Sequence, residues 1–305
     1  MTIDWKGVFP AVTTQVAEDM SLDLAATQAV VDALIRDGVT GLIALGTVGE
    51  NNSLEHEEKV RVLSAIVEVT AGRVPVVTGV SEYDTRRAIR YAQAAEKAGA
   101  DGLMLLPPMV YVPKPHELAA HFRGVGENVG LPIMLYNNPP AYRTVIDPEV
   151  MAMLDDVKTI VAIKESSPDT RRFTDFLNAF GDRYVLFAGL DDVALEGLWL
   201  GARGWVSGLT NAFPQESVAL VDAVARGDNA KALEIYRWFM PLLHLDAEHD
   251  LVQSIKLAEE VMGRGSERVL PPRQTLIGAR RAEVIAMVEQ AAATRPDLTP
   301  TAVAA

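Results

Sequence analysis

A lysine near the end of an apolar run is the residue of this chain best suited to covalent chemistry. Residues 159–167 read Thr-Ile-Val-Ala-Ile-Lys-Glu-Ser-Ser, and a run of this kind without polar alternation predicts a strand buried on both faces. Burial strips water from an ammonium group and lowers its pKa, which would make Lys164 a nucleophile towards carbonyl carbon. The alternative is a lysine that reaches solvent from the strand end or pairs with Glu165.

Two further predicted strand ends offer groups that could assist such an amine. Tyr136 shares a strand face with Met134 and could move protons for Lys164, although a core tyrosine with a satisfied hydroxyl is the alternative. The turn from Gly46 to Gly49 lets backbone N–H groups approach an anion, and Thr47 adds a hydroxyl. A simple tight turn would show the same residues.

The polar residues that follow the seventh and eighth predicted strands also point to this end of the fold. The seventh strand ends in Gly189-Leu190-Asp191-Asp192, and the eighth ends in Ser207-Gly208-Leu209-Thr210-Asn211. Ordinary turns and helix caps use the same residue types. An active site is favoured because all these polar residues are predicted to lie with Lys164 at the same end of the sheet.

The elements that must position these residues alternate regularly between strand and helix. Strands are predicted at 8–14, 41–46, 74–80, 102–106, 132–137, 159–165, 184–188 and 205–209. Helices are predicted between them, with Asp84 as one cap, and the last of the eight spans 214–226. Eight such units predict a (β/α)8 TIM barrel with its active site at the carboxyl ends of the strands. An open doubly wound sheet is disfavoured because no GxGxxG loop follows a strand.

The chain is expected to divide into a barrel, a helical extension and a tail. The barrel spans residues 1–226, and the C-terminal helical extension spans 227–294, with helices expected at 228–240, 247–263 and 278–292. Residues 295–305 are expected to form a disordered tail.

Composition excludes several classes of function. A formal net charge of −13 argues against binding to nucleic acids or acidic membranes, and the absence of cysteine excludes disulfides, thiolate metal sites and cysteine nucleophiles. The five histidines are scattered without an HExxH pattern, so no metal site is expected. Met1–Lys6 has no apolar signal core, and no stretch is long enough to span a bilayer. A cytoplasmic location is the expectation.

Taken together, four motifs in this order resemble one family of enzymes over about residues 6–289. The motifs are Gly46-Thr47-Val48-Gly49-Glu50, Tyr136-Asn137-Asn138-Pro139, Ile163-Lys164-Glu165-Ser166 and Ala188-Gly189-Leu190-Asp191-Asp192. They are similar to those of the dihydrodipicolinate synthase / N-acetylneuraminate lyase family of class I aldolase-type barrels. The resemblance implies a Schiff base between Lys164 and a 2-oxo acid, with Tyr136 as proton-transferring partner. It also implies a carboxylate held by Thr47 and the Val48 N–H, a contribution from the backbone near Val206, homotetramers, and no cofactor.

The chain departs from the synthases of this family at three places. Val48 replaces a second threonine, Tyr111 comes late after the strand-four proline, and Arg143 stands two residues late after the Tyr-Asn-x-Pro motif. Tyr111 and Arg143 are the residues that would substitute if the loops are reshaped. The catalytic candidates are Lys164, Tyr136 and Thr47, and the substrate-binding candidates are Thr47, Val48, Gly49, Tyr111, Asn138, Arg143, Gly189 and Val206.

These departures are similar to those of catabolic members of the family. The resemblance suggests a deaminase of 1-pyrroline-4-hydroxy-2-carboxylate from hydroxyproline breakdown, acting on a small 2-oxo acid or cyclic imino acid. A 2-keto-3-deoxy sugar acid dehydratase or aldolase and 4-hydroxy-tetrahydrodipicolinate synthase are the competing enzyme hypotheses. A catalytically idle barrel that only binds a metabolite is the alternative of another class.

Overall fold

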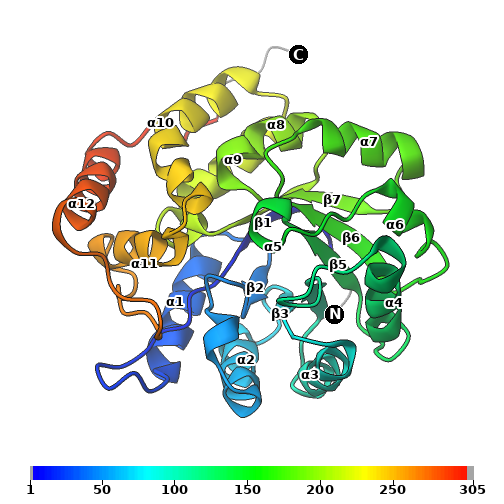
Figure 1. The fold of residues 1–305 in the computed structure, drawn as a ribbon. Coiled ribbons are helices and arrows are strands. Elements are labelled where there is room, and N and C mark those ends of the chain that lie inside the picture. Colours follow the sequence, from blue (N-terminus) through cyan, green and yellow to red (C-terminus); the bar gives the residue numbers. More distant parts are fainter. Residues whose placement is uncertain (1–2, 301–305) are drawn as a thin grey trace.

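Eight parallel strands surround the axis of the molecule and helices cover them on the outside (Figure 1). The computed structural model describes residues 3–300. The strands are β1 Gly7–Pro10, β2 Leu42–Ala44, β3 Val76–Val80, β4 Gly102–Leu105, β5 Ile133–Asn137, β6 Ile160–Glu165, β7 Val185–Ala188 and β8 Gly204–Ser207. β1 pairs with β8, and a bridge from Ala11 to Ile43 joins the β1 end to β2, so the ring closes. The predicted (β/α)8 barrel is confirmed.

The helices of the barrel follow the strands in the predicted alternation. They are α1 Leu24–Arg36, α2 His56–Thr70, α3 Thr85–Lys97, α4 Pro115–Gly126, α5 Pro139–Tyr142, α6 Pro148–Ala152, α7 Arg171–Phe180, α8 Ala194–Trp199 and α9 Pro214–Ala225. Short 3-10 turns are η1 Asn51–Ser53, η2 Asp191–Val193 and η3 Leu209–Asn211. The predicted cap at Asp84 is confirmed, since its side chain accepts a hydrogen bond from the Arg87 N–H at 3.0 Å.

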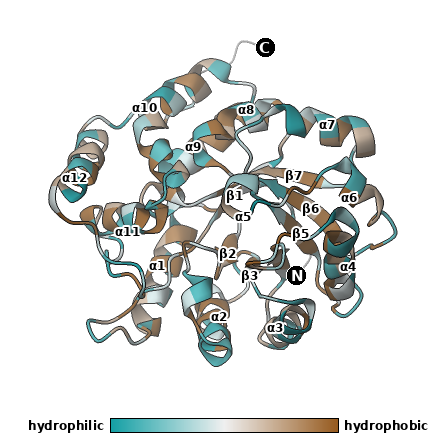
Figure 2. Ribbon diagram, in the orientation of Figure 1, coloured by the Kyte–Doolittle hydropathy of each residue, from teal (hydrophilic) through white to brown (hydrophobic). Residues whose placement is uncertain are grey.

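Alternation along the strands separates two apolar cores. One fills the space between strands and helices, and a smaller one fills the barrel interior with Phe9, Met104, Met134, Phe187 and Val206 among its members. Figure 2 shows the corresponding pattern, with brown strands at the centre and helices that mix brown and teal. Side chains at alternate positions of a strand therefore face either the interior or the helices.

Three helices follow the barrel and pack along one side of it (Figure 1). They are α10 Asn229–Ala247, α11 Leu251–Val261 and α12 Gly278–Ala293. The prediction that the first of them ends at residue 240 is wrong, because α10 continues through Pro241. Leu242, Leu243 and Leu245 are buried beyond the proline, and this apolar packing outweighs the backbone hydrogen bond that proline cannot make.

The chain after α12 differs from the disordered tail expected there. Arg295 pairs with Glu216 of α9 at 3.1 Å, and the Lys231 ammonium donates to the Asp297 carbonyl at 2.9 Å. Residues 1–2 and 301–305 lie outside the described residues, so the predictions for them stay untested. None of the helices in residues 3–300 combines the length and apolar character needed to cross a bilayer.

A buried ion pair fastens α11 to the turn after β2. The Lys256 ammonium lies 2.9 Å from Glu50 Oε1, both side chains are fully buried, and Lys256 also donates to the Thr14 carbonyl. The second oxygen of Glu50 accepts a hydrogen bond from the Leu270 N–H at 2.8 Å. Because Glu50 belongs to the same turn as Thr47, the helical extension holds that turn in place.

Removing one partner of this pair should destabilise the fold strongly. We expect Lys256→Met to lower the free energy of unfolding by about 3–5 kcal/mol, because the Glu50 carboxylate would stay buried with only the more distant Arg273, 3.7 Å from its other oxygen, as a cation. Urea unfolding followed by circular dichroism measures the change. The control is Lys6→Met, which breaks an exposed pair with Asp4 and should change stability by less than about 1 kcal/mol. Equal effects of the two variants would contradict this role.

Candidate active site

The cavity at the carboxyl ends of the strands is lined by all three predicted catalytic residues, Lys164, Tyr136 and Thr47. It is small, with a water-accessible volume of about 80 Å³. Its lining consists of Ala11, Gly46, Thr47, Val48, Met104, Tyr136, Asn138, Ala141, Tyr142, Lys164, Gly189, Leu190, Gly208, Asp246 and Leu251. Strand ends supply most of these residues, as barrel geometry requires, and the last two come from α10 and the start of α11.

Lys164 lies near the end of β6 with its side chain directed into this cavity. The residue is only 6% exposed, and its ammonium nitrogen lies 4.0 Å from the centroid of the Tyr136 ring. Burial lowers the pKa of Lys164, while the nearby acidic groups of Asp246, Tyr142 and Asp191 oppose that change. A lysine in this environment holds a reactive neutral amine at a lower pH than a solvated lysine does.

Glu165 points away from Lys164, towards the helices. Its carboxylate accepts two hydrogen bonds from the Asn137 amide at 2.8 and 2.9 Å and one from the Ser167 N–H. It also forms an ion pair with Arg172 at 2.9 Å. Burial raises the pKa of Glu165, and Arg172 opposes that shift. The alternative in which Lys164 pairs with Glu165 is therefore wrong, because successive strand residues face opposite sides.

Tyr136 lies directly opposite Lys164 in the pairing of β5 with β6. Its hydroxyl accepts a hydrogen bond from the Asn138 side chain at 2.9 Å. Burial raises the pKa of Tyr136 to about 12, so the hydroxyl keeps its proton near neutral pH. A buried phenol beside the amine is placed to give and take protons during imine formation.

Tyr142 was missed as a site residue by the sequence prediction. Its ring packs edge-on against Tyr136, with the ring centroids 5.7 Å apart, and its hydroxyl lies 3.3 Å from Thr47 Oγ1. Burial raises the pKa of Tyr142. Thr47, Tyr142 and Tyr136 thus form a continuous series of polar groups that ends beside Lys164. The only signal in the sequence is that Tyr142 follows the Tyr136-Asn137-Asn138-Pro139 motif closely.

Gly189 makes room for the lysine. A Cβ atom at this position would lie 2.3 Å from Ser166 Oγ and 2.5 Å from Lys164 Cγ. Distances this short are prohibitive, so any larger residue would displace the Lys164 side chain. The absence of a side chain at Gly189 therefore allows Lys164 to extend into the cavity.

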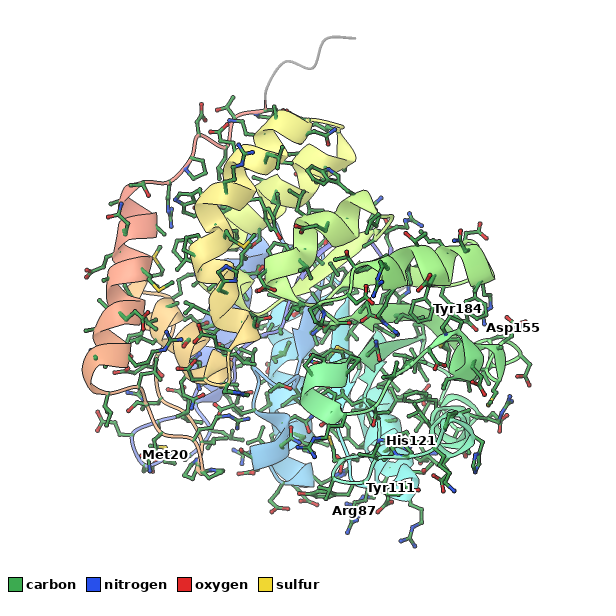
Figure 3. All side chains as sticks on the ribbon, turned by 45° about the horizontal axis from the view of Figure 1, so that its top comes forward. Met20, Arg87, Tyr111, His121, Asp155 and Tyr184 are labelled. Carbon is green, nitrogen blue, oxygen red and sulfur yellow. The ribbon has the colours of Figure 1, made fainter. Side chains whose placement is uncertain are left out.

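Four of the predicted substrate-binding residues do not line the cavity. Gly49 packs closely against the backbone of Leu45 and Val12, and Val206 is buried in the barrel interior. Tyr111 is 54% exposed and donates to Glu117, and Figure 3 labels it in the lower part of the molecule. Arg143 is also exposed.

The short helix α5 explains why Arg143 lies outside. One helical turn from Pro139 brings Tyr142 to the cavity, and the backbone then reverses at Arg143 with φ of 55°. Arg143, predicted as a substrate-binding residue, therefore does not line the cavity. Thr47, Val48, Asn138 and Gly189 do line the cavity with Lys164 and Tyr136.

Asp246 and Leu251 reach the cavity from the helical extension and were not predicted. Asp246 stands near the end of α10, and Leu251 begins α11. No local motif marks either residue, because their place depends on how the extension packs. Within residues 3–300, no group of three or more histidine and acidic side chains is arranged to hold a metal ion.

The lowered pKa of Lys164 predicts how its reactivity depends on pH. The neutral amine is half populated at the pKa, so covalent trapping of pyruvate by cyanoborohydride should reach half its maximal rate clearly below pH 10.5, the ordinary lysine value. Mass spectrometry of a pH series measures the adduct, and Lys164→Ala is the blank. A midpoint at the ordinary lysine value would contradict a desolvated amine.

Loss of the Tyr142 hydroxyl should slow imine formation. We expect Tyr142→Phe and Tyr136→Phe each to lower the trapping rate by about 10²–10⁴-fold, because each removes a proton-transferring group. The matched control is Tyr91→Phe, which removes a buried hydroxyl bonded to Thr78 outside the cavity. An unchanged rate in Tyr142→Phe would remove this residue from the proton path.

Comparison with known proteins agrees with this geometry. Residues 4–291 match the dihydrodipicolinate synthetase family. An uncharacterized DapA-like lyase of Rhizobium meliloti is 33% identical over 92% of this chain and 95% of that protein. A 4-hydroxy-tetrahydrodipicolinate synthase of Methanothrix thermoacetophila is 35% identical over 78% of this chain and 81% of its own.

A solved structure shows the same fold. YagE, a prophage protein of E. coli K12 solved in complex with pyruvate, is 30% identical, with a TM-score of 0.90 over 95% of this chain and 99% of that one. The likeness therefore extends over the helical extension as well as the barrel. The chain belongs to the dihydrodipicolinate synthetase family and is a class I aldolase-type, Schiff-base-forming lyase.

Proposed function

We propose that this enzyme acts on a small 2-oxo acid or cyclic imino acid that carries a single carboxylate. The specific substrate we propose is 1-pyrroline-4-hydroxy-2-carboxylate, which the enzyme would deaminate. Thr47, Val48, Lys164 and Tyr136 are the residues to which we assign carboxylate binding and imine chemistry, since all four line one cavity. The expected homotetramer and cytoplasmic location remain predictions.

The charges in the cavity are the observation that carries this proposal. Among the described residues that line it, Lys164 is the basic residue and Asp246 is the acidic one, while Arg143 lies outside. A second substrate carboxylate would meet Asp246 without a compensating cation, which is unfavourable at low dielectric. The cavity therefore suits a monocarboxylate, and Val48, Met104 and Ala141 favour a small one.

The proposed reaction uses only these side chains and water. The Lys164 amine adds to C2 of the cyclic imine, the bond from C2 to the ring nitrogen breaks, and that nitrogen leaves as an amine on C5. A proton lost from C3 gives an enamine, whose electrons expel the C4 hydroxyl as water. Proton shifts then convert the C5 amine into an imine. Hydrolysis of the C5 imine releases ammonia. Hydrolysis of the imine with Lys164 regenerates the amine and yields 2-oxoglutarate semialdehyde.

The first covalent steps need two supports that the cavity offers. Thr47 and the Val48 N–H would hold the carboxylate and so orient C2 towards the amine. Tyr136, with its retained proton, would serve as acid when the ring nitrogen leaves and as base when C3 loses its proton. Its position opposite Lys164 supports the assignment of both roles to one phenol.

A 2-keto-3-deoxy sugar acid dehydratase or aldolase is the second candidate. Such substrates also carry one carboxylate, and the Asp246 carboxylate could accept hydrogen bonds from their hydroxyl groups. The pyruvate complex of YagE supports a substrate that contains a pyruvate-like group. The synthase remains the alternative suggested by the names of the relatives, and a catalytically idle barrel is the alternative of another class.

A substrate panel separates these possibilities. We expect ammonia release from 1-pyrroline-4-hydroxy-2-carboxylate, no condensation of pyruvate with aspartate semialdehyde, and complete loss of turnover in Lys164→Ala. Glutamate dehydrogenase coupling measures the ammonia. Water loss or cleavage of 2-keto-3-deoxygluconate without ammonia release from the pyrroline would favour the second candidate. Efficient condensation would identify the synthase, and no reaction with any compound would favour the idle barrel.

A further inference from the structure

Asp246 is an acidic residue that the helical extension adds to the cavity of the barrel. It lies one residue before the end of α10 and is partly buried, whereas the neighbouring acid Glu248 is exposed. An acid at the carboxyl end of a helix lies against the negative end of the helix dipole, which disfavours its charged form. The fold therefore keeps a carboxyl group at an unfavourable place, facing the substrate space.

Contacts from two other elements fix the position of Asp246. The Tyr236 hydroxyl donates to the Asp192 carbonyl at 2.7 Å, and His244 Nδ1 lies 3.0 Å from the Asp192 carboxylate, so α10 is held against η2. The backbone N–H of Asp191 donates to the Asp246 side chain. A Cβ atom on Gly208 would lie only 2.4 Å from Asp246 Oδ1, so Gly208 leaves the room that this carboxyl occupies.

The carboxyl group of Asp246 keeps bonding capacity for a ligand. Within residues 3–300, no lysine, arginine or histidine pairs with it at 4.0 Å or less, and Lys164 is farther away than that. A carboxylate can accept about four hydrogen bonds, and one backbone N–H occupies only part of this capacity. Atoms of a substrate bound to Lys164 can therefore stand between the amine and the acid.

The environment also favours a proton on this acid. Burial raises the pKa of Asp246 to about 6, with Lys164 opposing the shift and Asp192 adding to it. The carboxyl of Asp191 faces the same region, and it is engaged by Trp205, Ser207 and the Leu209 N–H. Near neutral pH a useful fraction of Asp246 is thus a carboxylic acid, which is the form that gives a proton.

Building on the proposed function, we propose that Asp246 binds the hydroxyl on C4 of the substrate and protonates it as it leaves. The Lys164 nitrogen re-forms its double bond to C2, and the C2–C3 double-bond electrons form the new C3–C4 double bond as the C4–O bond breaks. Its electron pair takes the Asp246 proton, so water departs and Asp246 is left as a carboxylate. No oxidant or additional reactant is needed. The substrate class is a 2-oxo acid or its cyclic imine with a hydroxyl two carbons beyond the carbonyl.

A purely electrostatic role for Asp246 gives different expectations. If Asp246 only offset the charge of Lys164, its replacement would change imine formation equally for compounds with and without the C4 hydroxyl. If it also binds and protonates that hydroxyl, its replacement should add a loss that appears only with the hydroxylated acid, beyond any change shared by both acids through the pKa of Lys164. Two probe acids of equal length separate these roles.

The experiment traps imines of 2-oxobutanoate and 4-hydroxy-2-oxobutanoate with cyanoborohydride and reads the adducts by mass. In the wild type, both acids should be trapped on Lys164, and the hydroxylated acid should give an adduct lighter by one water. Asp246→Asn should trap both acids but lose water about 10²–10⁴-fold more slowly. Asp246→Ala should also need about 2- to 10-fold more hydroxylated acid, because the hydrogen bond between the carboxylic acid and the C4 hydroxyl is lost.

Controls distinguish the possible failures. Glu248→Gln makes the same change in charge near the end of α10, outside the cavity, and should behave as wild type in both readouts. If the wild type traps neither acid, the imine-based function itself fails. If trapping is normal but water loss is absent in the wild type, or equal in Asp246→Asn and the wild type, the role of Asp246 is overturned. Equal changes with both acids would establish the electrostatic role instead.

Discussion

The desolvation of one amine is the constraint on which the rest of this structure depends. Lys164 can be reactive near neutral pH only if water is kept from it, and its burial inside a closed ring of strands achieves this. The Tyr136 ring covers the amine from one side, with the ammonium nitrogen 4.0 Å from the ring centroid. Gly189 has no side chain and so leaves room for the aliphatic part of the lysine. Burial of a charged amine that has no close ion-pair partner costs stability, and the chemistry of Lys164 accounts for its position.

The opposite face of the same two strands fixes the geometry of this amine. Asn137 and Glu165 are neighbours in the sheet, and their hydrogen bonds, with the ion pair to Arg172, lie among the helices rather than in the cavity. Since a shift by one residue would exchange the two faces, this buried polar network also sets Tyr136 against Lys164. Structural and catalytic groups therefore alternate along a single pair of strands.

Local sequence signals predicted the barrel and the part of the site that lies on strand ends. Lys164, Tyr136 and Thr47 follow apolar runs directly, so strand periodicity was enough to bring them together. Tyr142 and Arg143 could not be told apart in this way, because a single turn of helix decides which side chain enters the cavity. Asp246 could not be predicted as a site residue, because its position depends on α10 continuing past Pro241. There, apolar packing overrides the low helix propensity of proline.

The way the extension meets the barrel has a consequence for how such enzymes diversify. The nucleophile belongs to the barrel, whereas α10 and α11 supply one wall of the cavity. The ion pair between Lys256 of α11 and Glu50 of the barrel holds this wall in place. Substitution at Leu251, which lines the cavity from α11, can therefore change which molecules are admitted while Lys164 and Tyr136 stay as they are. Exchange of the whole segment between relatives would change both the fit of the substrate and the acid at position 246, on an unchanged nucleophile.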